Sequence, residues 1–131
     1  MKKGLLLNQA LSEIVAAMGH GDLLVIGDAG LPVPRGVPRV DLAVRPGVPG
    51  FLETVEAVLS ELQVEGAIVA EETAERNPEV SEGLKRLLGD LPVEVTGHER
   101  LKRLCGSAVA VVRTGECTPY ANVILKAGVT F

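Results

Sequence analysis

The sequence predicts a three-layer α/β/α fold with a mixed, largely parallel sheet, built as one domain over residues 1–131. The main observation is an alternation of two patterns along the chain. Short apolar runs typical of buried strands alternate with segments whose apolar residues recur every three or four positions, as on one face of a helix. The length of 131 residues fits one hydrophobic core. Strands that alternate with helices favour helical layers packed on a mostly parallel sheet.

The first half of the chain predicts two helices and three strands. Apolar residues at helical spacing between Leu11 and Met18 mark the first helix, which ends at Gly19. The next elements, in chain order, are a strand over 23–27, a proline- and glycine-rich loop over 28–38, a strand over 40–44, a helix with apolar positions from 51 to 62, and a strand over 64–70. The carboxylate pair Glu71–Glu72 follows this last strand.

The second half begins with a clear helix start. Asn77 is a favourable cap, and Pro78 suits the first helical position; the helix then continues to Gly89. The elements expected after it are a strand over 93–96, a short helix over 97–104, and apolar strands over 107–112 and 122–126.

The composition argues against several classes of function. The net charge is −4, there is no basic cluster, and only one tyrosine and two phenylalanines are present, so nucleic-acid binding is not expected. Apolar runs have the length of strands, so no membrane partner is expected. Cys105 and Cys117 lack a Cys-x-x-Cys spacing, which indicates neither a disulfide framework nor a zinc site. We expect two buried free thiols in a reducing compartment.

No cofactor is expected from the sequence. There is no glycine-rich phosphate loop, no Gly-x-Ser-x-Gly turn, and no metal-ligand spacing among the histidines and carboxylates. What remains is a set of groups suited to proton transfer: two imidazoles, several carboxylates, one phenol and an amide. This set fits an isomerase-like reaction that needs no cofactor.

Ligands of open α/β sheets bind beyond the carboxyl ends of the strands, and several polar residues are expected there. Asp28 follows the first strand, His98 follows a later one, and Tyr120 and Asn122 lie after the strand over 107–112. His20 stands at the other end of the first strand, behind the first helix. Structural roles remain open: His20 could interact with the helix dipole, Asp28 could be a turn residue, and Tyr120 could fill a core edge.

Six motifs give the sequence a resemblance to a known family. They are MGHGD around His20, DAGLPVP from Asp28, DLAVRPGVPGF from Asp41, VEGAIVAEE from Val64, TGHERLK from Thr96 and GECTPYANVIL from Gly115. The sequence resembles the ribose pyranase and fucose mutarotase family over essentially its whole length, from MKKG to AGVTF. The DAGLP segment is similar to the ribose branch, because the fucose branch has a sequence like DANFP at this place.

The resemblance implies a three-layer α/β fold and a ring-shaped homo-oligomer, typically a decamer of two pentamers. It also implies interconversion of the β-pyranose and β-furanose forms of D-ribose in the cytoplasm, where the furanose would supply ribokinase. Under the resemblance, His20 is the proton donor. The residues that would bind the sugar are Asp28, His98, Lys102, Tyr120, Asn122 and the backbone of Ala121.

Two questions about the site stay open at this level. We expect the first strand and the preceding helix to bring His20 and Asp28 to one sugar. The segment 115–131 either packs on a neighbouring subunit, which would make the site shared between chains, or completes its own sheet. Alternative functions are a fucose or ribose mutarotase that exchanges anomers, and a non-catalytic sugar-binding accessory protein.

Overall fold

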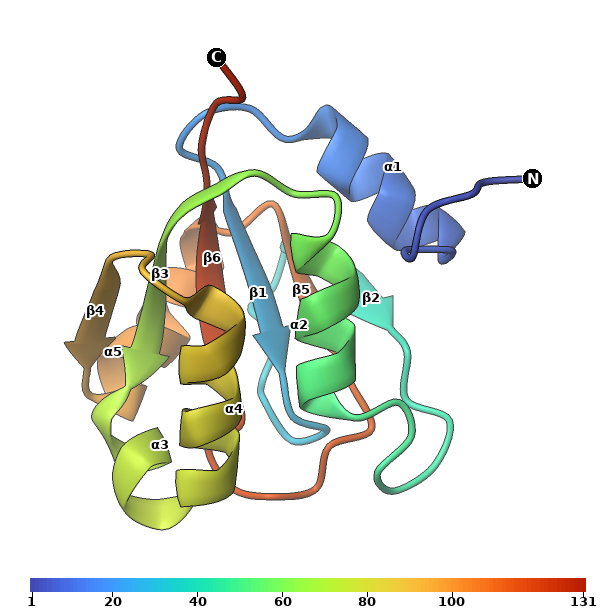
Figure 1. Ribbon diagram of the computed structural model, residues 1–131. Coiled ribbons are helices and arrows are strands. Elements are labelled where there is room, and N and C mark those ends of the chain that lie inside the picture. Colours follow the sequence, from blue (N-terminus) through green and yellow to red (C-terminus); the bar gives the residue numbers. More distant parts are fainter.

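A computed structural model describes residues 1–131, and its centre is a six-stranded sheet (Figure 1). The strands are β1 (Leu23–Gly27), β2 (Arg39–Asp41), β3 (Val64–Ala70), β4 (Val93–Thr96), β5 (Ala110–Arg113) and β6 (Val123–Ala127). Their order in the sheet is β2-β5-β1-β6-β3-β4. Strand β6 runs antiparallel to both of its neighbours, whereas every other pairing is parallel. The prediction of a mixed, largely parallel sheet is confirmed.

Helices cover both faces of this sheet. They are α1 (Gln9–Ala17), α2 (Phe51–Leu59), α3 (Glu71–Arg76), α4 (Pro78–Leu88) and α5 (His98–Leu104), with a 3₁₀ turn at Cys105–Ser107. Helices α2 and α4 lie on one face, and α5 lies behind the sheet (Figure 1). Side-chain oxygens of Asn8 and Asn77 accept hydrogen bonds from the first turns of α1 and α4, so the sequence sets both starts.

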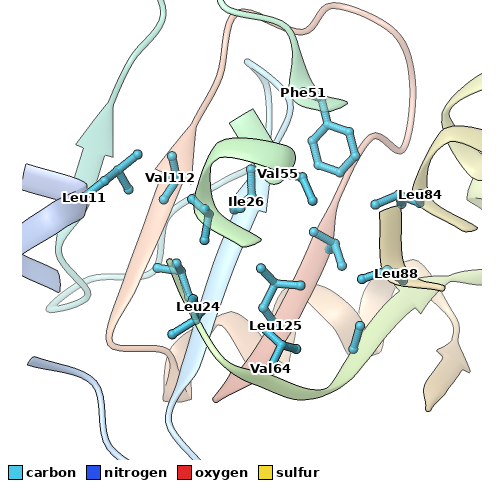
Figure 2. Close-up of a cluster of buried hydrophobic side chains, with 14 of the residues drawn as sticks. Leu11, Leu24, Ile26, Phe51, Val55, Val64, Leu84, Leu88, Val112 and Leu125 are labelled. Atoms are coloured by element: carbon cyan, nitrogen blue, oxygen red, sulfur yellow. The ribbon is translucent and has the colours of Figure 1, made fainter. Parts of the chain in front are cut away.

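The alternation of side chains along each strand produces two cores. Leu24 and Ile26 of β1 belong to the larger core, which contains the buried residues of α1, α2 and α4 (Figure 2). Val25, on the opposite face, packs with Leu101 and Cys105 from α5 and the turn after it. The loop over 28–38 adds Leu31 to this smaller core. The three-layer prediction is therefore confirmed, although one short helix and a loop form the third layer.

Several elements match the prediction, and the differences have local causes. The strands over 23–27, 64–70 and 93–96 and the helix over 78–88 have the predicted bounds. Strand β2 is shorter than predicted, because the Asp41 carboxylate accepts a hydrogen bond from the Ala43 amide and starts a turn. Strand β5 starts later than predicted, because the 3₁₀ turn extends α5. Helix α3 was not predicted; Glu71 and Glu72 favour its amino terminus.

None of the helices has the length and apolar character that a bilayer crossing requires. The structure also contains no group of three or more histidine, cysteine, aspartate or glutamate side chains placed to hold a metal ion.

The two cysteines differ in environment. Cys105 is buried, as expected, but Cys117 is exposed, so the expectation of two buried thiols is wrong for the second. Cys117 lies in the loop before β6, where the chain turns at the surface. Burial raises the pKa of the Cys105 thiol, which keeps it protonated and unreactive over a wider pH range.

We expect an aromatic disulfide reagent to label only Cys117 in the native protein near neutral pH, because the thiolate is the reacting species. Absorbance of the released thiol measures this. The Cys117→Ser variant should lose the native reaction, and both thiols of the wild type should react in denaturant. Rapid labelling of native Cys117→Ser would contradict the protected state of Cys105.

Candidate functional site

Polar residues from three parts of the chain meet at the carboxyl edge of the parallel strands. Asp28 follows β1, His98 opens α5 directly after β4, and Tyr120 and Asn122 precede β6. Because β6 is antiparallel, the residues before it lie at the same edge as the residues that follow its parallel neighbours. The antiparallel strand therefore completes a cluster at this edge, at the bottom of Figure 1.

Asn122 links this cluster to the end of β1. Its Oδ1 accepts a hydrogen bond from the backbone amide of Asp28 at 3.1 Å. The contact requires a glycine at position 27, because a Cβ there would lie 2.8 Å from Asn122 Oδ1. One oxygen of Asp28 accepts from the Gly30 amide at 2.9 Å, and the other has no hydrogen bond within the chain. Asp28 is half-buried and keeps one oxygen for a ligand.

His98 and Tyr120 form an aromatic pair at the same edge. Their ring centroids are 5.0 Å apart and the rings are nearly perpendicular, at 86°. The Glu72 carboxylate accepts a hydrogen bond from the His98 backbone amide at 3.0 Å, which fixes the start of α5. His98 is half-buried, and the side chain of Tyr120 limits the directions that its ring can take.

Tyr120 has an unusual backbone conformation. It is the one non-glycine residue with positive φ, at 56°, a region that costs free energy for a bulky side chain. Hydrogen bonds from neighbouring segments hold it: Thr73 Oγ1 donates to the Tyr120 carbonyl at 2.8 Å, and Asn77 Nδ2 donates to the Pro119 carbonyl at 2.8 Å. Helices α3 and α4 therefore determine where the tyrosine lies.

Two buried polar atoms at this edge lack a hydrogen-bond partner, His98 Nδ1 and Asn122 Nδ2. No other buried side-chain nitrogen or oxygen in the chain is unpaired. A buried polar atom without a partner is costly, and native proteins usually pair such atoms with a ligand or an ordered water. Both atoms belong to residues that the sequence predicted to bind a ligand. We therefore take the cluster at the carboxyl edge as the candidate binding site.

Two further sequence candidates lie near this cluster. Ala121 is fully buried between Tyr120 and Asn122, where only its backbone could contact a ligand. Lys102 is one turn after His98 in α5, and its Nζ forms an ion pair with Glu99 at 2.7 Å. The hydrogen bond from Lys102 holds the pKa of Glu99 below its usual value. The lysine is thus already paired within the chain.

His20 does not join the cluster. The turn that carries it is bonded to the end of β6, since the Gly21 amide donates to the Ala127 carbonyl at 2.8 Å. This end of the sheet is opposite to Asp28, because His20 precedes the five-residue strand β1 and Asp28 follows it. At about 3.3 Å per residue, the strand alone separates them by on the order of 15 Å. The expectation that one chain brings His20 and Asp28 to the same sugar is wrong.

Sequence reasoning missed the residues that support the site. Thr73 and Asn77 hold the Tyr120 loop, but a threonine in a helix and a helix cap give no functional signal. Glu72 was noted as a strand-end carboxylate, and its role is to bond the His98 amide. Glu65, the second residue of the apolar strand β3, contacts His20 at 2.8 Å and had no signal in the sequence.

A largely apolar groove of the chain lies elsewhere. It has a volume of about 460 Å³ between α3, α4 and β4, and its lining includes Leu84, Leu88, Val93 and Val95. None of the candidate site residues lines it. Directed polar groups fix the orientation of a small polar ligand better than apolar area does, so we base the site on the cluster.

The fold and the cluster together define an α/β protein whose candidate site, at the carboxyl edge of its strands, suits a small polar ligand. The chain belongs to the RbsD / FucU transport protein family, which it matches over residues 1–130. It is 72% identical to a protein of Symbiobacterium thermophilum named D-ribose pyranase, over 131 residues that cover both chains completely. The family resemblance seen in the sequence is confirmed.

Solved structures agree with this assignment. The structure of Bacillus subtilis RbsD complexed with D-ribose has a TM-score of 0.97 and 47% identity, with complete coverage of both chains. The fucose mutarotase of Streptococcus pneumoniae in complex with L-fucose has a TM-score of 0.86 and 21% identity, again over both whole chains, which shows a common fold.

We expect Thr73→Val to lower the free energy of unfolding by about 0.5–1.5 kcal/mol, because the carbonyl of Tyr120 loses its hydroxyl donor and keeps only the Asn122 amide. Urea denaturation at one protein concentration measures the change. Thr73→Ser keeps the hydroxyl and is the matched control, with a smaller loss. Equal stability of Thr73→Val and the wild type would contradict the role given to this hydrogen bond.

Proposed function

We propose that the protein is a D-ribose pyranase, an isomerase that interconverts β-D-ribopyranose and β-D-ribofuranose. The full-length identity of 72% to a protein of that name carries the proposal. The likeness to RbsD complexed with D-ribose supports a sugar as the ligand. The two unpartnered atoms at His98 and Asn122 suit a polyhydroxylated molecule, because each hydroxyl both donates and accepts hydrogen bonds.

The reaction is a balanced exchange of protons and carbon–oxygen bonds. In ring opening, the anomeric hydroxyl O1 loses its proton, C1=O1 forms, the C1–O5 bond breaks, and O5 takes a proton. In reclosure, O4 attacks C1 and loses its proton while O1 regains one. No oxidation occurs and no net proton is consumed, so acid–base groups are sufficient and no cofactor is required.

We assign the groups at the two edges of the sheet to different tasks. His20 donates the proton to O5 in opening and takes the proton from O4 in reclosure, as an imidazole can do near neutral pH. Asp28, whose second oxygen is free, holds the anomeric hydroxyl. His98, Tyr120 and Asn122 hold the remaining hydroxyls, with the Ala121 backbone and Lys102 at the margin of the same site.

The separation of these groups leads to a site shared between two chains. His20 and Asp28 lie at opposite ends of β1, so one sugar can contact both only if a second copy supplies one of them. Such a contact joins two different surfaces of the same chain, and repeated contacts of this kind form a ring when the rotation between neighbours closes. We propose a homodecamer of two pentameric rings, in which each site pairs His20 of one chain with the carboxyl edge of the next.

The proposed place of the reaction is the cytoplasm, between uptake and phosphorylation of ribose. Uptake would deliver the pyranose, and ribokinase would consume the furanose, so the enzyme would connect the two steps. It would bind neither nucleic acid nor membrane.

We expect catalytic amounts of the protein to accelerate exchange between the pyranose and furanose signals of ribose, measured by NMR magnetisation transfer. His20→Ala should lower the rate by about 10²–10⁴-fold, the usual contribution of a general acid or base. Lys85→Ala, at an exposed position of α4, is the control and should match the wild type.

The same experiment separates the alternative functions. Exchange of α and β anomers of fucose without pyranose–furanose exchange of ribose would identify a mutarotase. Saturable binding without any exchange would identify a sugar-binding accessory protein. Full activity of a folded His20→Ala variant would contradict the role of His20 alone.

We expect the inactive variants His20→Ala and His98→Ala to restore activity when they are refolded together. In a shared site, one chain then supplies His20 and its neighbour supplies His98, and random mixing leaves roughly a quarter of the sites complete. The exchange rate of the mixture measures this. Each variant refolded alone is the control, and a mixture as inactive as its parts would contradict a site shared between chains.

A further inference from the structure

His20 belongs to a charged cluster outside the carboxyl edge. Its Nε2 lies 2.8 Å from Glu65 Oε2, and Lys126 Nζ lies 2.7 Å from Glu65 Oε1. Both carboxylate oxygens are therefore in use, one by the imidazole and one by the ammonium group. The side chains of His20 and Lys126 are 60% and 50% exposed in the single chain, and that of Glu65 is 34% exposed.

We propose that Glu65 is the positioning residue of His20: it binds Nε2, fixes the tautomer, and leaves Nδ1 as the nitrogen that exchanges protons with the sugar. The inference rests on the proposed role of His20 and adds two statements to it. One is the identity of the reacting nitrogen, and the other is the residue that selects it.

The backbone directs Glu65 to this position through an irregularity in the sheet. Along β3, Val64 is opposite Ala127 and Gly66 is opposite Lys126, so Glu65 is an extra residue in a β-bulge. A bulge changes the direction of a side chain, and Glu65 and Gly66 are both partly buried where a regular strand would alternate. The backbone comes very close here, because a Cβ on Gly128 would lie 3.0 Å from Glu65 Cβ. The position of Glu65 is thus built into the pairing of β3 with β6.

The backbone of His20 is fixed separately. The turn around it closes with a hydrogen bond from the Gly19 amide to Asp22 Oδ2 at 2.8 Å, and Gly21 adopts a positive φ of 86°. The Ala127 amide donates to the Asp22 carbonyl at 2.8 Å, which ties the turn to β6. This turn leaves the imidazole free to rotate about its side-chain bonds, so a separate contact must orient the ring.

The protonation state of Glu65 determines which nitrogen carries the proton. Hydrogen bonds from Lys126 and then His20 lower the pKa of Glu65, so the carboxylate is ionised at neutral pH and can only accept. The bonded Nε2 must therefore carry a proton. Nδ1, which has no hydrogen bond within the chain, changes protonation when His20 acts as acid and base. Asp22 is the other carboxylate next to this turn, and the Gly19 amide occupies one of its oxygens.

The test combines kinetics with a spectroscopic measurement that does not depend on activity. The chain has only two histidines, so solid-state ¹⁵N NMR of histidine-labelled assemblies gives few signals, and His20→Ala assigns them. In the wild type at a pH where the imidazole is neutral, we expect a protonated Nε2 and a bare Nδ1 at His20. Glu65→Ala should give a mixture of both tautomers, and its kcat should fall roughly tenfold to a hundredfold with KM nearly unchanged.

Two other variants separate orientation from charge and from general damage. Glu65→Gln keeps an acceptor oxygen for Nε2, so we expect the wild-type tautomer and a kcat between those of the wild type and Glu65→Ala. Glu61→Gln removes a carboxylate from a comparable ion pair, with Lys2 at 2.7 Å, and should match the wild type in both measurements. Gly128→Ala keeps the carboxylate but places a methyl group 3.0 Å from Glu65 Cβ, so Glu65 must shift slightly and kcat should fall by less than in Glu65→Ala.

The outcomes distinguish this inference from the proposed function. The inference would be overturned if Nε2 of His20 carries no proton in the wild type. It would also be overturned if folded Glu65→Ala keeps the wild-type kcat and the wild-type tautomer. Both outcomes count against the inference even if His20→Ala is inactive. Full activity of His20→Ala would instead remove the catalytic role of His20, and with it the catalytic part of the inference. A lower kcat together with mixed tautomers in Glu65→Ala would support both.

Discussion

The position of β6 is the constraint on which the rest of the molecule depends. A single antiparallel strand lies between β1 and β3, in the middle of an otherwise parallel sheet, and Val123, Ile124 and Leu125 of this strand are fully buried. Its direction places Asn122 at the carboxyl edge beside Asp28 and Lys126 at the opposite edge beside Glu65. If this strand were parallel to its neighbours, Asn122 and Lys126 would exchange places. Asn122 would then be far from Asp28, and Lys126 far from Glu65. The six-residue span from Asn122 to Ala127 therefore supports both groups of functional side chains.

Local patterns in the sequence predicted the elements well and their long-range arrangement less well. The apolar run ending at Ala70 and the Asn77-Pro78 helix start gave correct bounds, because strand burial and helix capping depend on neighbouring residues. The direction of β6 depends on pairing with β1 and β3, which no short window of sequence contains. The same limit explains the error on His20 and Asp28, which are close in sequence but lie at opposite ends of one strand. The sequence did not predict the bulge at Glu65 for a similar reason, because the bulge is defined only by the register of β3 against β6.

In the proposed shared site, the two edges of the sheet have different tasks. A sheet with helices on both faces offers ligand contacts at the ends of its strands. The carboxyl edge carries an aromatic pair, an amide and a carboxylate, which suit the holding of hydroxyl groups. Placing the imidazole at the other edge lets a second copy supply it, so association between chains completes the proposed site. Under this proposal, activity depends on assembly, and an isolated chain has only the separate halves of the site.

Each half of the proposed site is held in place by its own chain. At the carboxyl edge, Thr73, Asn77 and Glu72 fix the backbone of Tyr120 and His98. At the other edge, the turn bonded to Ala127 fixes the backbone of His20, and Glu65 orients its ring. Groups that are ordered in the folded chain lose little conformational entropy when two copies meet, so more of the contact energy is left to hold the assembly and the sugar.

This structure has two unusual backbone features, a tyrosine with positive φ and a bulge in a central strand, and each half of the proposed site contains one of them. Each is a local cost in free energy that places a functional side chain, which is the pattern expected where a fold has been shaped by the needs of a site.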